Sequence, residues 1–238
     1  MSGEWAAPEA QWVRDGSIVF QQALSRLGDG QFTLESNLST WTKAHVIAHV
    51  SANAQAIGRL LRWAMTGERT LMYDSVEARD KEIAEGASMD PSSLRSWWQE
   101  SDAHLLTSFA TLPEEAWNNV VVTAQGREVP ARETLWMRSR EVCIHAVDLD
   151  AGVGFPDLPE EFLLRLIKEA VAKHSSGEVN SAVLLTDDDG RQWRIEGDGE
   201  QFAVTGSLGG LASWLTGRGA DGVRDSHNSR PPDLAKWL

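Results

Sequence analysis

Two segments of the chain carry side chains that could bind a metal, spaced four residues apart. His45 and His49 lie in one segment, and Glu141 and His145 lie in the other. Four residues advance an α-helix by about 400°, so the members of each pair lie within about 40° of one line along their helix. Two such pairs on neighbouring helices can point at a common centre. Divalent transition metals accept imidazole and carboxylate ligands, so this spacing indicates a metal site.

A site built from these residues would be open, as catalytic metal sites are. Two histidines and one glutamate leave a fourth position for water or a substrate atom. Spacing alone does not decide whether His45 or His49 is the ligand, although the side chains around His49 are mostly small and leave room for a guest. Asp148 shares the face of Glu141 and His145 and could orient an imidazole. Such pairs also arise by chance on exposed helices, so surface residues without a metal are the alternative.

The single cysteine, Cys143, lies between Glu141 and His145 in the sequence. Two residues rotate a helix by about 200°, so the cysteine points away from the candidate ligands. We expect it to be a small buried residue rather than a nucleophile. One cysteine allows neither an internal disulfide nor a Cys-rich zinc site, which fits a reducing compartment.

For several other polar residues, a structural role is the simplest interpretation. We expect a helix-surface ion pair for Arg138 and a solvated hairpin tip for Asp187–Asp189. Three histidines have no liganding partner at a useful spacing, and we expect surface or capping positions for them: His104, His174 and His227.

The charge balance excludes several classes of partner. The 238 residues include 22 Lys and Arg against 35 Asp and Glu, a net charge of −13, and no basic cluster. Nucleic acids and anionic membranes attract basic surfaces, so we expect neither as a partner. There is no run of 18 apolar residues and no signal-peptide pattern, and 42% hydrophobic with 24% charged residues is typical of a globular protein. We expect a cytoplasmic monomer that binds small molecules.

The elements that must position the candidate ligands are mostly helices. Apolar residues recur at spacings of three and four through the first two thirds of the chain. The expected helices are 9–27, 39–66 with Ser39 or Thr40 as N-cap, 75–85, 91–109 and 130–149, with a hairpin at 119–129. The two ligand pairs then lie on the second and the fifth helix of a four- or five-helix bundle.

A change of pattern near residue 155 predicts a domain boundary. The segment GVGFPDLP has two Gly and two Pro in eight residues and cannot continue a helix. Beyond it we expect a helix at 160–173, strands at 182–185, 192–195 and 202–204, and a helix capped by Ser207. The sequence therefore predicts an α+β protein of two domains, a helix bundle with a small hairpin insertion (1–155) and a small α+β domain (156–238).

Long stretches of the sequence resemble one family. TWTKAHVIAHVSANA, MYDSVEARDKEIAEGA and above all TAQGREVPARETLWMRSREVCIHAVDL closely resemble the mycothiol-dependent maleylpyruvate isomerases, and VTGSLGGLASWLTGRGADGV extends the resemblance more loosely. The resemblance implies a DinB-like four-helix bundle for the first domain. It implies His49, Glu141 and His145, rather than His45, as ligands of zinc or another divalent metal. It also implies that Arg218, within GRGADG, acts in the reaction.

The resemblance implies a reaction as well. This is the mycothiol-dependent conversion of maleylpyruvate to fumarylpyruvate, in the gentisate route of aromatic degradation, by reversible addition of a zinc-activated thiolate to the double bond. Arg218 would pair a substrate carboxylate or the developing enolate, and Arg138 is a second candidate for this work. Two alternatives stay open: a mycothiol S-transferase or detoxification enzyme on the same scaffold, and a non-enzymatic metal-binding stress protein.

Overall fold

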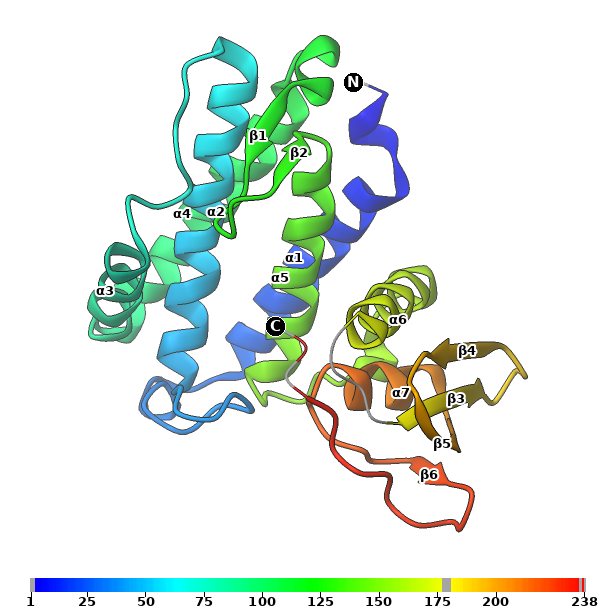
Figure 1. The fold of residues 1–238 in the computed structure, drawn as a ribbon. Coiled ribbons are helices and arrows are strands. Elements are labelled where there is room, and N and C mark those ends of the chain that lie inside the picture. The colour runs from blue at the N-terminus through cyan, green and yellow to red at the C-terminus, as the bar shows by residue number, and fades with distance from the viewer. Residues whose placement is uncertain (1–2, 177–180, 236, 238) are drawn as a thin grey trace. The chain divides into compact units, whose positions relative to one another are not determined.

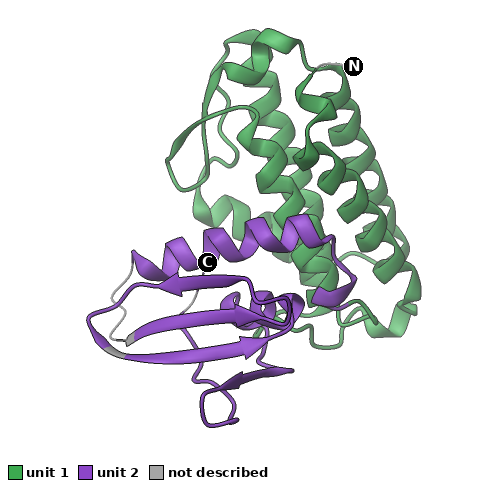
Figure 2. Ribbon diagram, turned by 90° about the vertical axis from the view of Figure 1, so that its right-hand side faces the viewer, with its two compact units in different colours: residues 1–153 green, residues 154–238 purple. Residues whose placement is uncertain are grey.

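A computed structural model describes residues 3–176, 181–235 and 237 of the chain. The chain divides into two compact units, Met1–Val153 and Gly154–Leu238, which Figure 2 shows in different colours. The predicted α+β class is confirmed, since helices dominate the first unit and the second adds a sheet. Within the described ranges, none of the helices has the length and apolarity that a membrane span needs.

The first unit is a bundle of long helices with one shorter helix and a small hairpin (Figure 1). The helices are α1 (Pro8–Arg26), α2 (Lys43–Thr66), α3 (Val76–Ala87), α4 (Pro91–Thr111) and α5 (Glu133–Asp148). The hairpin pairs β1 (Val120–Val122) with antiparallel β2 (Glu128–Pro130). Helix α1 packs along α5, and α2 packs against α3, α4 and α5. Helices α2 and α5, which carry the candidate ligands, are therefore neighbours.

Two predicted helix starts are wrong. Helix α2 begins at Lys43, because the hydroxyl of Thr42 accepts the backbone N–H of His45 and makes Thr42 the N-cap. Helix α5 begins at Glu133, because Pro130 still belongs to the hairpin and pairs with Val120. Proline is tolerated at the end of a short strand, where its missing N–H breaks no ladder.

Aromatic and aliphatic side chains fix how α2 is rotated in the bundle. The ring of Phe109 stacks between Trp5 and Trp117, with centroids 5.6 Å and 6.0 Å away. Residues of α2 join this core and are almost completely buried, among them Ile57, Leu60 and Leu61. Turning α2 would expose this apolar surface at about 25 cal/mol for each Å², so packing keeps one polar stripe of α2 directed at α5.

In its described residues, the second unit has a four-stranded sheet and two α-helices. Its elements are α6 (Glu160–Ser175), β3 (Ser181–Asp187), β4 (Gln192–Ile195), β5 (Gly199–Gly206), α7 (Leu208–Leu215) and β6 (Val223–Asp225). The strand order is β4-β3-β5-β6, with β3 and β5 parallel and both outer pairs antiparallel. The two helices pack against each other and against the sheet. Strand β6 was not predicted, since three residues are too few to show a period.

Two expectations for polar residues of this unit need correction. Of the two positions expected for His174, surface or capping, the structure supports the second, because the side chain is buried and its Nε2 lies 2.9 Å from the carbonyl oxygen of Leu215, the last residue of α7. Asp187 is also buried, and its carboxylate accepts hydrogen bonds from the backbone and the guanidinium of Arg191. Asp188 and Asp189 are exposed, as expected for a hairpin tip.

Candidate metal centre

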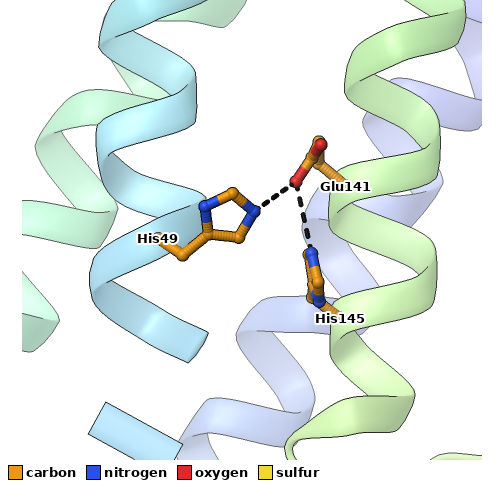
Figure 3. Close-up of side chains that lie close together, drawn as sticks. All are labelled: His49, Glu141 and His145. Atoms are coloured by element: carbon orange, nitrogen blue, oxygen red, sulfur yellow. Dashed lines mark hydrogen bonds and ion pairs between the residues drawn. The ribbon is translucent and has the colours of Figure 1, made fainter. Parts of the chain in front are cut away.

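Helices α2 and α5 bring His49, Glu141 and His145 together (Figure 3). Each residue offers one ligand atom, and these atoms all lie within 4.8 Å of one another. Oε2 of Glu141 is 2.9 Å from Nε2 of His49 and 3.3 Å from Nε2 of His145. Ligand atoms around a tetrahedral zinc ion lie about 3.3 Å apart, given bonds of about 2.0–2.2 Å. The donor set and its spacing therefore fit a divalent metal.

The charges of the three groups depend on one another. Burial alone would raise the pKa of Glu141, but the charge of His49 and hydrogen bonds from both imidazoles hold it well below its usual value. Burial would lower the pKa of His145, but hydrogen bonds to Asp148 and Glu141 outweigh it and raise the pKa to about 9. Burial dominates at His49, whose pKa is lowered. The cluster therefore offers an ionised carboxylate and one neutral imidazole at neutral pH.

Asp148 fixes the orientation of one candidate ligand. Its side chain is fully buried, and Oδ2 lies 2.8 Å from Nδ1 of His145, one turn earlier on α5. A carboxylate on Nδ1 leaves Nε2 directed at the cluster. The sequence-based interpretation of Asp148 as an orienting carboxylate agrees with this contact.

Lys43 ties the two ligand-bearing helices together and was missed by the sequence analysis. It lies in the first turn of α2, is 3% exposed, and its Nζ donates to the carbonyl oxygens of Leu149 (2.7 Å) and Asp150 (2.8 Å). These carbonyls follow the last turn of α5, where a positive charge is favourable. Asn37 adds two more hydrogen bonds to the same end of α5. These contacts fix the position of α2 along α5, and with it the position of His49 relative to His145.

Aromatic and cationic side chains surround His49. The half-buried ring of Trp41 lies 5.3 Å from the His49 ring, edge to face. Nη2 of Arg79, on α3, is 3.3 Å from Nδ1 of His49. Tyr73 lies in the loop before α3, with the Arg79 guanidinium 6.0 Å from its ring centre. Tyr73 and Arg79 fall within the stretch MYDSVEARDKEIAEGA, but neither has a metal-ligating type or a diagnostic spacing.

Comparison with known proteins gives a consistent result. Residues 13–150 match the family described as "Mycothiol maleylpyruvate isomerase N-terminal domain". A crystal structure of the mycothiol-dependent maleylpyruvate isomerase aligns with a TM-score of 0.92 and 40% identity, covering 100% of both chains. The chain belongs to the mycothiol-dependent maleylpyruvate isomerase family. The family indicated by the sequence resemblance is thereby confirmed.

Two further comparisons complete this result. A histidine-to-alanine mutant of the same isomerase aligns with a TM-score of 0.92 and 39% identity, again over 100% of both chains. YfiT from Bacillus subtilis, described as a probable metal-dependent hydrolase with an unusual four-helix bundle topology, covers 63% of this chain and 88% of its own, at 16% identity and a TM-score of 0.50. At that identity YfiT supports the fold of the bundle only. No curated protein matches the sequence.

His45 and Arg138 serve the bundle of this family member rather than the ligand cluster. Nδ1 of His45 lies 2.7 Å from the Thr42 hydroxyl, so the side chain helps to close the first turn of α2. Arg138 is fully buried, and its Nη2 donates to Asp102 at 2.9 Å. The expected ion pair of Arg138 exists, but its expected surface position is wrong, because the guanidinium lies inside the bundle over the ring of Trp98.

The one cysteine of this family member is not available as a nucleophile. Cys143 is completely buried, and its Sγ lies 3.9 Å from the Trp12 carbonyl oxygen, between α5 and α1. Burial raises the pKa of its thiol far above the usual value. The buried, inert position expected from the helical wheel is confirmed.

Arg218 belongs to a tight turn of the second unit. It follows α7 and lies between Gly217 and Gly219, whose φ angles of 75° and 116° favour glycine. Its backbone N–H donates to Ser213, and its Nη1 donates to the Thr216 carbonyl oxygen at 2.7 Å. The half-buried side chain is therefore held by its own turn.

Proposed function

We propose that the chain catalyses the mycothiol-dependent isomerisation of maleylpyruvate to fumarylpyruvate, a step of the gentisate route. The observation that carries the proposal is the 40% identity to a mycothiol-dependent maleylpyruvate isomerase over the whole of both chains. The cluster of His49, Glu141 and His145 supports it, since three protein ligands leave a coordination position for a thiol. The catalyst is then a thiol-dependent cis-trans isomerase with a divalent metal, for which we propose zinc.

The reaction needs a temporary loss of the double bond. Mycothiol, when bound, would supply a thiolate for reversible addition to the conjugated alkene, so that the bond between the two carbons could rotate as a single bond before the thiolate was released unchanged. A bound divalent metal supplies the low thiol pKa that makes such a thiolate available at neutral pH. The sulfur has to come from outside the chain, because Cys143 is buried and its pKa is raised.

Each of the remaining roles in the proposed reaction can be assigned to residues of the chain. His49, Glu141 and His145 would hold the metal, and Asp148 would orient His145 through Nδ1. Arg218 would pair a substrate carboxylate or the enolate oxygen, because a guanidinium offers two parallel N–H donors. No proton transfer to the carbon skeleton is needed, since the thiolate leaves as it came.

An assay of purified protein with maleylpyruvate tests the proposal. Isomerisation should require both mycothiol and the metal, and His49→Ala, Glu141→Ala and His145→Ala should lose metal and activity together. Arg218→Ala should keep the metal and lose turnover by about 100-fold or more, as for removal of one group that stabilises developing negative charge. Full activity of metal-free protein would exclude the metal role.

The same assay separates the alternatives. A mycothiol S-transferase would form a stable thioether with an electrophile and leave maleylpyruvate unchanged. A non-enzymatic metal-binding protein would bind zinc and turn over neither substrate. The cytoplasmic location and the monomeric state expected from the sequence stay predictions.

A further inference from the structure

Arg79 contacts His49 on the side of the ring opposite Glu141. Its Nη2 is 3.3 Å from Nδ1 of His49, while Nε2 of the same ring is 2.9 Å from Glu141. The Arg79 side chain is 30% exposed, and its Nη1 donates to the exposed carboxylate of Asp80 at 2.9 Å. The guanidinium therefore reaches both a candidate metal ligand and solvent.

This contact is incompatible with metal binding through Nε2 of His49. A guanidinium has N–H donors and no acceptor, so it needs a bare Nδ1. With a metal on Nε2, a neutral imidazole carries its one proton on Nδ1. Two donors would then face each other, and Arg79 would have to direct its N–H groups to another acceptor.

Tyr73 is the aromatic neighbour of the Arg79 guanidinium. Guanidinium groups approach its ring from Arg79, at 6.0 Å, and from Arg59, at 5.7 Å. Burial, and next the charge of Glu141, raise the pKa of Tyr73 to about 12, so its hydroxyl remains a hydrogen-bond donor at neutral pH. The same Arg79 guanidinium contacts Nδ1 of His49 at 3.3 Å, so it links the ring of Tyr73 to the ligand cluster.

An anion is the ligand that suits this arrangement. A carboxylate accepts two parallel N–H bonds from a guanidinium, and maleylpyruvate carries two carboxylates. The chain as a whole has a net charge of −13, so a dianion needs local cations. We propose that Arg79 is a substrate-binding residue that pairs one carboxylate of the substrate beside the metal centre, an inference that rests on the proposed function.

Equilibrium binding of the product tests this proposal without turnover. Zinc-loaded full-length protein is titrated calorimetrically with fumarylpyruvate in the absence of mycothiol. Arg79→Ala should bind it about 10- to 100-fold more weakly, as expected for a lost charge-assisted hydrogen-bond pair, and Arg79→Lys should restore part of the affinity. Lys81→Ala is the matched control, because Lys81 is an exposed cation of the same helix that pairs with Glu85. It should bind like wild type, and zinc content should stay the same in all variants.

Three results would overturn the proposal. Wild-type affinity in Arg79→Ala would remove Arg79 from the substrate site, and loss of zinc from Arg79→Ala would make it a positioning residue of the metal centre. Absence of fumarylpyruvate binding by the wild type would also overturn it. The isomerase assay of the wild type tests the proposed function separately. If the wild type is active but Arg79→Ala binds fumarylpyruvate normally, only the role of Arg79 is refuted.

Discussion

Individual candidate ligands can be selected from the sequence when residue type and spacing coincide. His49, Glu141 and His145 combine metal-ligating types with helical spacing, and the resemblance selects His49 over His45. Arg79 lies 30 residues after His49, and no periodicity links the two positions. Arginine side chains on a polar helix are also usually exposed to solvent, so the sequence gives no reason to expect a buried contact. Its contact with His49 depends on how α3 packs, which a residue pattern does not contain.

Asp148 should control both the protonation of His145 and the affinity for metal. In chelated protein, His145 should titrate near pH 9 by NMR, and Asp148→Asn should lower this pKa, because the amide no longer stabilises the imidazolium. The raised pKa stabilises the metal-free fold fully below pH 6.5, and this contribution is lost as the pH rises through about 9. Zinc affinity should fall about 10- to 100-fold in Asp148→Asn, measured by competition with a chelator. Unchanged zinc affinity would mean that Asp148 does not orient the ligand.

Cys143 should be unreactive in the folded protein across the alkaline range. Its pKa is raised by burial, so a disulfide reagent should label it only after unfolding, even at pH 9. The unfolded thiol ionises near pH 8.5 while the folded thiol keeps its proton, so stability should decrease as the pH rises above that value. Cys143→Ser should leave the turnover number unchanged. Fast labelling of native protein, or a large loss of turnover with the fold intact, would contradict the buried assignment.

Helices can be predicted here because their apolar faces repeat, but their ends depend on local hydrogen bonds. The period indicates α2 and α5, whereas Thr42 and Pro130 determine where they begin. Thr42 competes with Ser39 and Thr40, all residues that favour an N-cap, and only the chain path selects among them. Thr40 adopts a left-handed conformation with φ of 72°, which places it in the turn before the cap. The spacing of the candidate ligands is unaffected, since both helices extend well past their starts.

Lys43 should couple the stability of the bundle to the geometry of the metal centre. Lys43→Met keeps the stem but removes the donors to Leu149 and Asp150, which leaves the end of α5 without these partners. The free energy of unfolding should drop by about 1–3 kcal/mol, with weaker zinc binding, because α2 and α5 are no longer fixed at this end. Lys81→Met, in an exposed position on α3, is the matched control and should change neither quantity. An unaffected metal affinity in Lys43→Met would show that the ligands keep their places without this anchor.

At the scale of the whole chain, the net charge bears on substrate binding, and the division into two units bears on where the candidate ligands lie. The net charge of −13 opposes the approach of a dianion, so recognition has to depend on local positive groups. Arg79 belongs to the first unit and Arg218 to the second. All three candidate ligands lie in the first unit.

Zinc should therefore stabilise the protein through the first unit alone. A metal that binds the folded but not the unfolded chain adds about 2.7 kcal/mol at a free concentration 100 times its Kd, because folding and binding are linked. Calorimetry of chelated and zinc-loaded protein should show a higher unfolding midpoint with zinc. His145→Ala should abolish this rise, since it removes a ligand between α2 and α5, whereas Arg218→Ala should keep it in full. An equal rise in His145→Ala would place the bound zinc at another site, and loss of the rise in Arg218→Ala would show that the second unit takes part in holding the metal.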